Sequence, residues 1–118
     1  MGIQQFILRH IATVDHLRAL LLLREEAGRA WTAMEVTAAL YLQPKAASGV
    51  LASLEASGLL SSAGGEYRYG PRTPELARLA DELATLDRER PVTLIKLIYS
   101  RPDTLEAFAD AFKLRKDT

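Results

Sequence analysis

A set of polar side chains between positions 43 and 72 has the types that contact nucleic acid. They are Gln43, Lys45, Ser48, Ser53, Arg68 and Arg72. Base edges in duplex DNA are read mainly by Arg, Lys, Asn and Gln, while Ser can hydrogen-bond to bases or to phosphates. The sequence therefore predicts these residues as candidate DNA contacts, with the two arginines directed at phosphates.

The charge of this stretch limits how strongly it can attract a polyanion. Between positions 30 and 72 the cations are Lys45, Arg68 and Arg72, and the anions are Glu35, Glu55 and Glu66. The whole chain has a formal net charge of zero. Because phosphate neutralisation drives much of the affinity for duplex DNA, binding needs a local basic patch. The small side chains around Lys45 are equally suited to packing against another protein, so that alternative stays open.

The remaining reactive side chains form no catalytic or metal-binding pattern. His10 and His16 are off the spacing of three or four residues that shares a helix face, and the chain has no cysteine. Ser48 has no identifiable base. The pair Gly64-Gly65 is not followed by the helix and the Lys-Ser/Thr of a phosphate loop. We therefore predict no enzyme activity, no cofactor and no metal site.

Two helices joined by a tight turn must position the residues from 43 to 53. Thr32 and Glu35 have the spacing of a capping box, which predicts a helix over 32–40. Pro44 suits the first position of the next helix, where its missing N–H costs nothing. Gly58 is expected to end that helix in the left-handed conformation.

A two-stranded ribbon must position Arg68. It is expected to begin at Leu59-Leu60, turn at Gly64-Gly65 and return through Tyr67 and Tyr69, which alternate along the strand. Packing of these two tyrosines against the leucine-rich helix expected over 14–27 is favoured over base stacking.

Further helices are expected on both sides of this region. One runs from 14 to 27, capped by Thr13 and stopped by Gly28, and another starts at Thr73-Pro74-Glu75. The apolar segment 92–99 fits a helix or a buried strand, with the helix favoured, and a last helix starts at Asp103. Residues 3–11 fit a helical turn or a strand.

Residues 14 to 72 resemble the winged-helix domains of small bacterial transcriptional regulators of the MarR and ArsR types. The leucine-rich first helix, the 32–40 helix, the segment 44–60 and the 64–69 hairpin carry the resemblance. It implies a mainly α fold with a small antiparallel β-ribbon, a winged helix-turn-helix followed by C-terminal helices. It also implies that the third helix of the domain, which starts at Pro44, enters the major groove of DNA. The 64–69 hairpin, called the wing, would reach the DNA backbone or minor groove. ArsR-type metal sensing is not implied, because that site needs Cys or His clusters.

The C-terminal part resembles no family that we recognise. Residues 1–72 are expected to form the winged-helix domain and 73–118 a helical extension within one compact domain. The extension carries an apolar stripe that we predict to be a dimer interface, because a large exposed apolar patch is rarely left bare. Its residues are Leu76, Leu79, Leu83, Leu86, Leu94, Ile98, Phe108 and Phe112.

These observations predict a cytoplasmic transcriptional regulator that binds duplex DNA as a homodimer. The start of the chain has no secretory signal, and the apolar run Ala19–Leu23 is too short to span a membrane. The main alternative is a winged-helix module that binds another regulatory protein without DNA. A third possibility is a ligand-sensing regulator with its pocket near Trp31, Tyr99 and the two phenylalanines.

Overall fold

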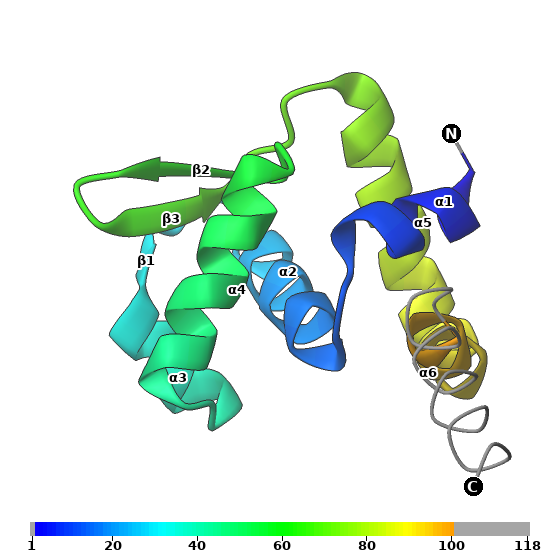
Figure 1. The fold of residues 1–118 in the computed structure, drawn as a ribbon. Helices are drawn as coiled ribbons and strands as arrows, with labels where there is room; N and C mark the ends of the chain where they lie inside the picture. Colours follow the sequence, from blue (N-terminus) through cyan, green and yellow to red (C-terminus); the bar gives the residue numbers. More distant parts are fainter. Residues whose placement is uncertain (1, 101–118) are drawn as a thin grey trace, which may run out of the picture.

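The computed structural model describes residues 2–100 of the chain (Figure 1). The helices are α1 (Ile3–His10), α2 (Val14–Glu25), α3 (Ala33–Leu40), α4 (Pro44–Ala56), α5 (Pro74–Glu89) and α6 (Pro91–Tyr99). The strands are β1 (Trp31–Thr32), β2 (Leu60–Ala63) and β3 (Glu66–Tyr69). The described part is thus mainly helical with a small antiparallel sheet, which confirms the predicted fold class at this level.

Local capping fixes the start of α3. The Thr32 hydroxyl accepts a hydrogen bond from the Glu35 N–H at 3.2 Å, and the Glu35 carboxylate accepts one from the Thr32 N–H at 2.9 Å. The Thr32 N–H and the nearby Arg29 guanidinium stabilise the ionised carboxylate and lower the pKa of Glu35. The predicted capping box is therefore confirmed.

A sharp turn separates α3 from α4. Tyr41 ends α3 with φ +56° and ψ +43°, a left-handed conformation that is unusual for a residue with a Cβ atom. The Leu42 N–H then donates to the Thr37 carbonyl at 3.1 Å. Pro44 begins α4, as predicted, because its fixed φ and missing N–H suit the first turn of a helix.

The sheet has the strand order β1-β3-β2, with antiparallel pairing throughout. The β2–β3 hairpin confirms the predicted ribbon, and its turn residues Gly64 and Gly65 have φ of +60° and +81°. β1 was not expected, because a strand of two residues is too short to produce an alternating pattern. It joins the sheet through Trp31, which pairs with Tyr67.

One predicted glycine stop is confirmed and the other is wrong. Gly58 follows α4 with φ +84°, and the Leu59 N–H donates to the Leu54 carbonyl at 3.1 Å. Gly28 has no positive φ. The chain instead leaves α2 at Glu26, whose carbonyl accepts from the Arg29 N–H at 2.9 Å. That hydrogen bond closes the turn, so no left-handed residue is needed at position 28.

One apolar core joins the elements on both sides of position 72. It contains fully buried side chains from α1, α2, α4, α5 and α6, among them Phe6, Leu20, Leu51, Leu83 and Leu94. In Figure 1, α1 lies beside α5 and α6 on the opposite side of α2 from the hairpin. The two segments that the sequence left open, 3–11 and 92–99, are therefore both helices, and both contribute to this core.

This core changes the interpretation of the apolar stripe after residue 73. Leu79, Leu83, Leu94 and Ile98 are fully buried within the chain itself, and Leu76 and Leu86 pack partly buried against the same core. The core extends across residue 72, because α1 packs against both C-terminal helices α5 and α6. These six side chains therefore offer little surface to a second copy. Phe108, Phe112 and the predicted helix from Asp103 lie outside the described residues.

Among residues 2–100, no helix combines the length and apolar character that a membrane span requires.

The backbone at Gly58 generates a stability prediction. A residue with a side chain at position 58 would have to keep the left-handed backbone conformation. Its Cβ atom would lie 3.2 Å from Arg72 Cδ and 3.4 Å from Leu76 Cδ1. We expect Gly58→Val to lower the free energy of unfolding by about 1–3 kcal/mol in chemical denaturation. The matched control is Gly49→Ala on α4, where a Cβ meets nothing within 4 Å and should raise stability by roughly 0.5–1 kcal/mol. Equal midpoints for both variants and the wild type would contradict this account.

Candidate nucleic-acid interface

The exposed face of α4 is lined by small and polar side chains. Its inner face packs Ala47, Val50, Leu51 and Leu54 into the core. The helical period then directs the remaining positions outward, and these exposed residues are Lys45, Ser48, Gly49, Ala52, Ser53 and Ala56. Gln43 is exposed immediately before the helix. Four of the candidate contacts, Gln43, Lys45, Ser48 and Ser53, are thus available to a ligand on or beside α4.

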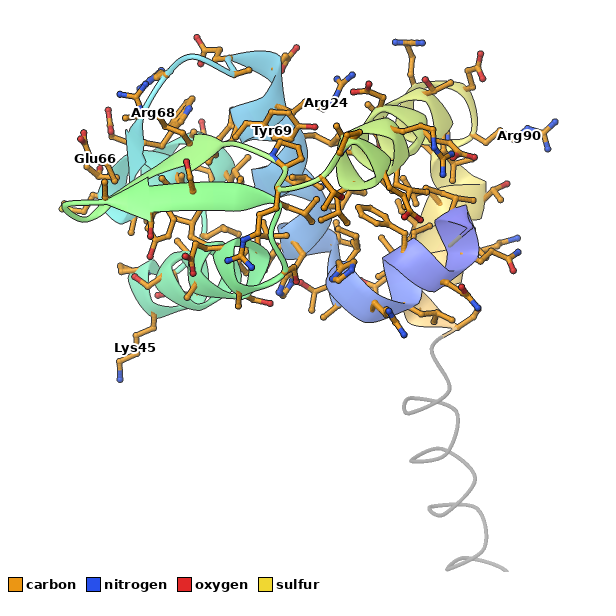
Figure 2. All side chains as sticks on the ribbon, turned by 90° about the horizontal axis from the view of Figure 1, so that it is seen from above. Arg24, Lys45, Glu66, Arg68, Tyr69 and Arg90 are labelled. Carbon is orange, nitrogen blue, oxygen red and sulfur yellow. The ribbon has the colours of Figure 1, made fainter. Side chains whose placement is uncertain are left out.

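Lys45 is the cation that projects from this face. Figure 2 shows its side chain directed away from the body of the protein at the start of α4. The acidic Glu55 lies near the other end of the helix and is half-buried. The surface therefore has a weak positive charge at its N-terminal end and hydroxyl groups along its length.

Arg68 lies on the other side of the hairpin from Lys45 (Figure 2). Its guanidinium donates a hydrogen bond from Nη1 to the Gly28 carbonyl at 3.0 Å. Side chains alternate along β3, and Tyr67 and Tyr69 pack against the core, so Arg68 must face the opposite way. The alternation was visible in the sequence, but only the packing of the tyrosines decides which face carries the arginine.

Arg72 lies beyond the C-terminal end of α4. Its N–H donates to the Gly58 carbonyl at 2.8 Å, and its aliphatic stem covers Gly58 beside Leu76. It is exposed, but it is not part of the hairpin. The six candidate contacts therefore do not form one surface, because four are grouped at α4 and the two arginines lie elsewhere.

Arg29 is a structural cation that the sequence interpretation missed. Its guanidinium lies 3.6 Å from the centre of the Trp31 ring, and it pairs with Glu26 at 3.3 Å and Glu35 at 3.1 Å. Stacking over an aromatic ring and pairing with carboxylates hold the loop between α2 and β1. Arg68 fastens the same loop through Gly28, so both arginines are engaged within the chain.

An ion pair beside the hairpin joins α2 to α5. Arg24 donates from Nε and Nη2 to one oxygen of Asp81, at 3.0 and 2.8 Å. The Tyr69 hydroxyl is buried nearby, and within residues 2–100 it has no hydrogen-bond partner. Burial raises the pKa of Tyr69, the Asp81 carboxylate raises it further, and Arg24 partly offsets this. The phenol is therefore neutral near neutral pH.

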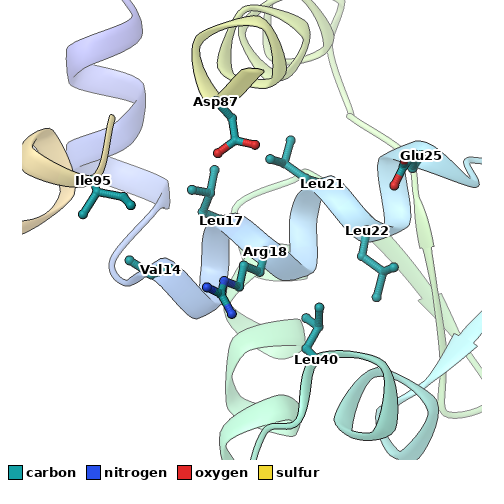
Figure 3. Close-up of a pocket in the computed structure, with 9 residues that line it drawn as sticks. All are labelled: Val14, Leu17, Arg18, Leu21, Leu22, Glu25, Leu40, Asp87 and Ile95. Atoms are coloured by element: carbon teal, nitrogen blue, oxygen red, sulfur yellow. The ribbon is translucent and has the colours of Figure 1, made fainter. Parts of the chain in front are cut away.

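A groove of about 320 Å³ follows the outer face of α2 (Figure 3). Its apolar lining residues are Val14, Leu17, Leu21, Leu22, Leu40 and Ile95. Arg18, Glu25 and Asp87 add charges to it. This groove is not the pocket expected near Trp31 and Tyr99, because neither of them lines it.

The described residues also contain no group of three His, Cys, Asp or Glu side chains arranged to hold a metal ion. The chain matches no protein-family model, no curated protein and no solved structure. A functional assignment therefore depends on the arrangement of the elements and on the surface chemistry just described.

The environment of Tyr69 gives a prediction for alkaline pH. Because its pKa is raised in the folded state, the unfolded chain ionises first, and the stability from this group is lost as pH rises above about 10. We expect Tyr69→Phe to match or slightly exceed wild-type stability at pH 7, since it removes a buried hydroxyl without a partner. It should also lose less stability than the wild type between pH 9 and 11, in urea denaturation at several pH values. Tyr99→Phe, on an exposed side chain of α6, is the control and should follow the wild type.

Proposed function

We propose that this protein is a DNA-binding transcriptional regulator of the winged-helix type, with α4 as its recognition helix. The order α2, β1, α3, α4, β2, β3 supports this, since a tight turn joins α3 to α4 and a hairpin follows. In the helix-turn-helix mode of docking, the second helix of the pair lies in the major groove. The observation that carries the proposal is the exposed face of α4.

The small side chains on that face favour close approach to a duplex. An α-helix with its side chains is about 10–12 Å across, and the major groove of B-DNA is about 12 Å wide. Gly49, Ala52 and Ala56 add little width, so the α4 backbone can approach the base edges. Ser48 and Ser53 then supply hydrogen-bonding groups to the bases or phosphates, and Gln43 can contact a base edge at the start of the helix.

The distribution of positive charge determines how strongly DNA binding depends on salt concentration. Lys45 is the cation on the α4 face, while Arg68 is hydrogen-bonded to Gly28 on the other side of the hairpin. Each neutralised phosphate contributes about −0.9 to the slope of log K against log salt concentration. The salt dependence of binding is therefore shallow for each chain. Contacts between α4 and the major groove of DNA have to supply most of the affinity. Binding by two copies would double the number of phosphate contacts.

A second candidate function is a winged-helix module that binds another protein instead of DNA. Met34 and Tyr41 favour it, because these residues, in the first turn and at the C-cap of α3, are 80% and 94% exposed. Large exposed apolar side chains that gather on one surface are typical of protein–protein contacts. The engagement of Arg68 within the chain also favours this candidate, since it removes an expected phosphate contact.

Salt-titrated binding to duplex DNA tests the proposal. We expect Lys45→Ala to weaken binding by a similar factor for duplexes of different sequence, because a phosphate contact carries no sequence information. It should also reduce the slope of log K against log salt concentration by about 1, measured by fluorescence anisotropy. Arg68→Ala removes the same charge from the other side of the hairpin, so it is the matched control and should leave the slope unchanged. Ser48→Ala and Ser53→Ala should instead alter the preference among sequences, because hydroxyl contacts to bases carry sequence information.

Two results would contradict the DNA-binding proposal. One is binding too weak to measure at low salt by a wild-type protein that is folded by circular dichroism. The other is a salt slope that Lys45→Ala leaves unchanged. Either result would favour the protein-binding candidate, because the exposed surface around α3 does not require a polyanion.

A further inference from the structure

Helix α3 exposes an apolar stripe that no part of residues 2–100 covers. Met34, Ala38 and Tyr41 are all exposed; Met34 and Ala38 are four residues apart on one side of the helix, and Tyr41 follows at its C-cap. Glu35, the charged residue of α3, is already bound to Thr32 and Arg29. The stripe therefore presents an uncharged convex surface to the solvent.

Tyr41 adds backbone strain to the fold at the end of this stripe. Its φ of +56° belongs to the left-handed region, where glycine is accommodated without strain and a residue with a Cβ atom is not. Its ring is 94% exposed, so it adds almost no buried area to the core. The left-handed backbone favours glycine at this position, and the core gains almost nothing from the ring. A contact with another molecule would explain why an aromatic residue is there.

The groove along α2 is the concave surface that suits this stripe. Its floor extends from Val14 to Glu25, which is about 17 Å or three turns of helix. Leucines dominate the floor, and the acidic Glu25 and Asp87 outnumber the basic Arg18 at its edges. The exposed Lys45 follows Tyr41 after four residues, so the end of the stripe has the opposite charge from the groove.

We propose that the α3 stripe of one copy docks in the α2 groove of a second copy, and that the contact is reciprocal. An apolar stripe with a cation beyond its end and an apolar groove with acidic edges occur together on one chain. Leu40 lines the groove and Tyr41 follows it directly, so the two surfaces adjoin. A two-fold axis near this boundary pairs each stripe with the opposite groove and closes the dimer.

This dimer does not depend on DNA binding, and it differs from the interface expected on α5 and α6. It leaves the buried leucines of those helices in the core and, apart from the buried Leu17 in the groove, uses side chains that the structure exposes or half-exposes. Its test contains no DNA and changes none of the candidate DNA contacts, so failure of the dimer and failure of DNA binding can be distinguished.

The first measurement is the mass of the full chain as a function of concentration, by analytical ultracentrifugation from about 1 to 100 μM. We expect a monomer–dimer equilibrium for the wild type. The double variant Met34→Ser, Tyr41→Ser should be monomeric over the same range, because it removes both apolar anchors of the stripe. Val92→Ser changes an exposed apolar residue of α6 outside both surfaces, so it is the control and should dimerise like the wild type.

Tyr41→Gly separates a binding role from a structural one. Glycine relieves the left-handed strain, so the melting temperature of the monomer should stay the same or rise, measured at a concentration where the wild type is also monomeric. Loss of the aromatic anchor should nevertheless raise the dimer Kd by about tenfold or more. A residue with a purely structural role would not lose association while the fold became more stable.

Mixing two defective chains tests the pairing itself. Leu22→Arg places a charge in the groove on a half-buried side chain, and we expect it to be folded and monomeric. Mixed with the Met34→Ser, Tyr41→Ser chain, it should form a heterodimer weaker than the wild-type dimer, because one of the two reciprocal contacts is intact. A wild-type monomer at 100 μM, dimerisation unaffected by the stripe changes, or growth beyond two copies would each overturn the proposal.

Discussion

The burial of α2 constrains every other part of the structure. Leu20 and Leu23 are fully buried, and α2 packs against α3, α4 and β3. The Arg24–Asp81 pair also fastens it to α5. Most of its circumference is occupied in this way, so the helix-turn-helix and the hairpin on one side are fixed relative to the C-terminal helices on the other. The face that remains uncovered is the α2 groove, which is why the groove lies between these two parts.

Local chemistry made much of this fold predictable from the sequence. Thr13, Thr32 and Thr73 each accept a hydrogen bond from an N–H three residues later, and Pro44 begins α4. Such interactions need only neighbouring residues, so their sequence patterns identify helix starts directly. Gly58 was predictable for the same reason, because the left-handed conformation after a helix is a property of a single residue.

The candidate site was less predictable, because it depends on which faces pack together. Arg68 was expected at a phosphate, but the packing of Tyr69 against α2 turns it to the other side of the hairpin. Leu79 and Leu83 are predicted to contact a second copy, but both are buried within the chain, where α1 packs against α5. Lys45, Ser48 and Ser53, which are predicted as contacts, lie on the exposed face of α4, since Val50, Leu51 and Leu54 fix its inner face by helical period.

The hydrogen bond from Arg68 to Gly28 makes the hairpin and the loop after α2 one mechanical unit. Gly28 follows the end of α2 by three residues, and Glu25 at that end also lines the groove. A force that displaces the hairpin is therefore transmitted to the last turn of α2 before the bond breaks. This hydrogen bond acts together with the pairing of β1 with β3 and the Arg29 contacts, so the hairpin and the end of α2 are coupled through several bonds.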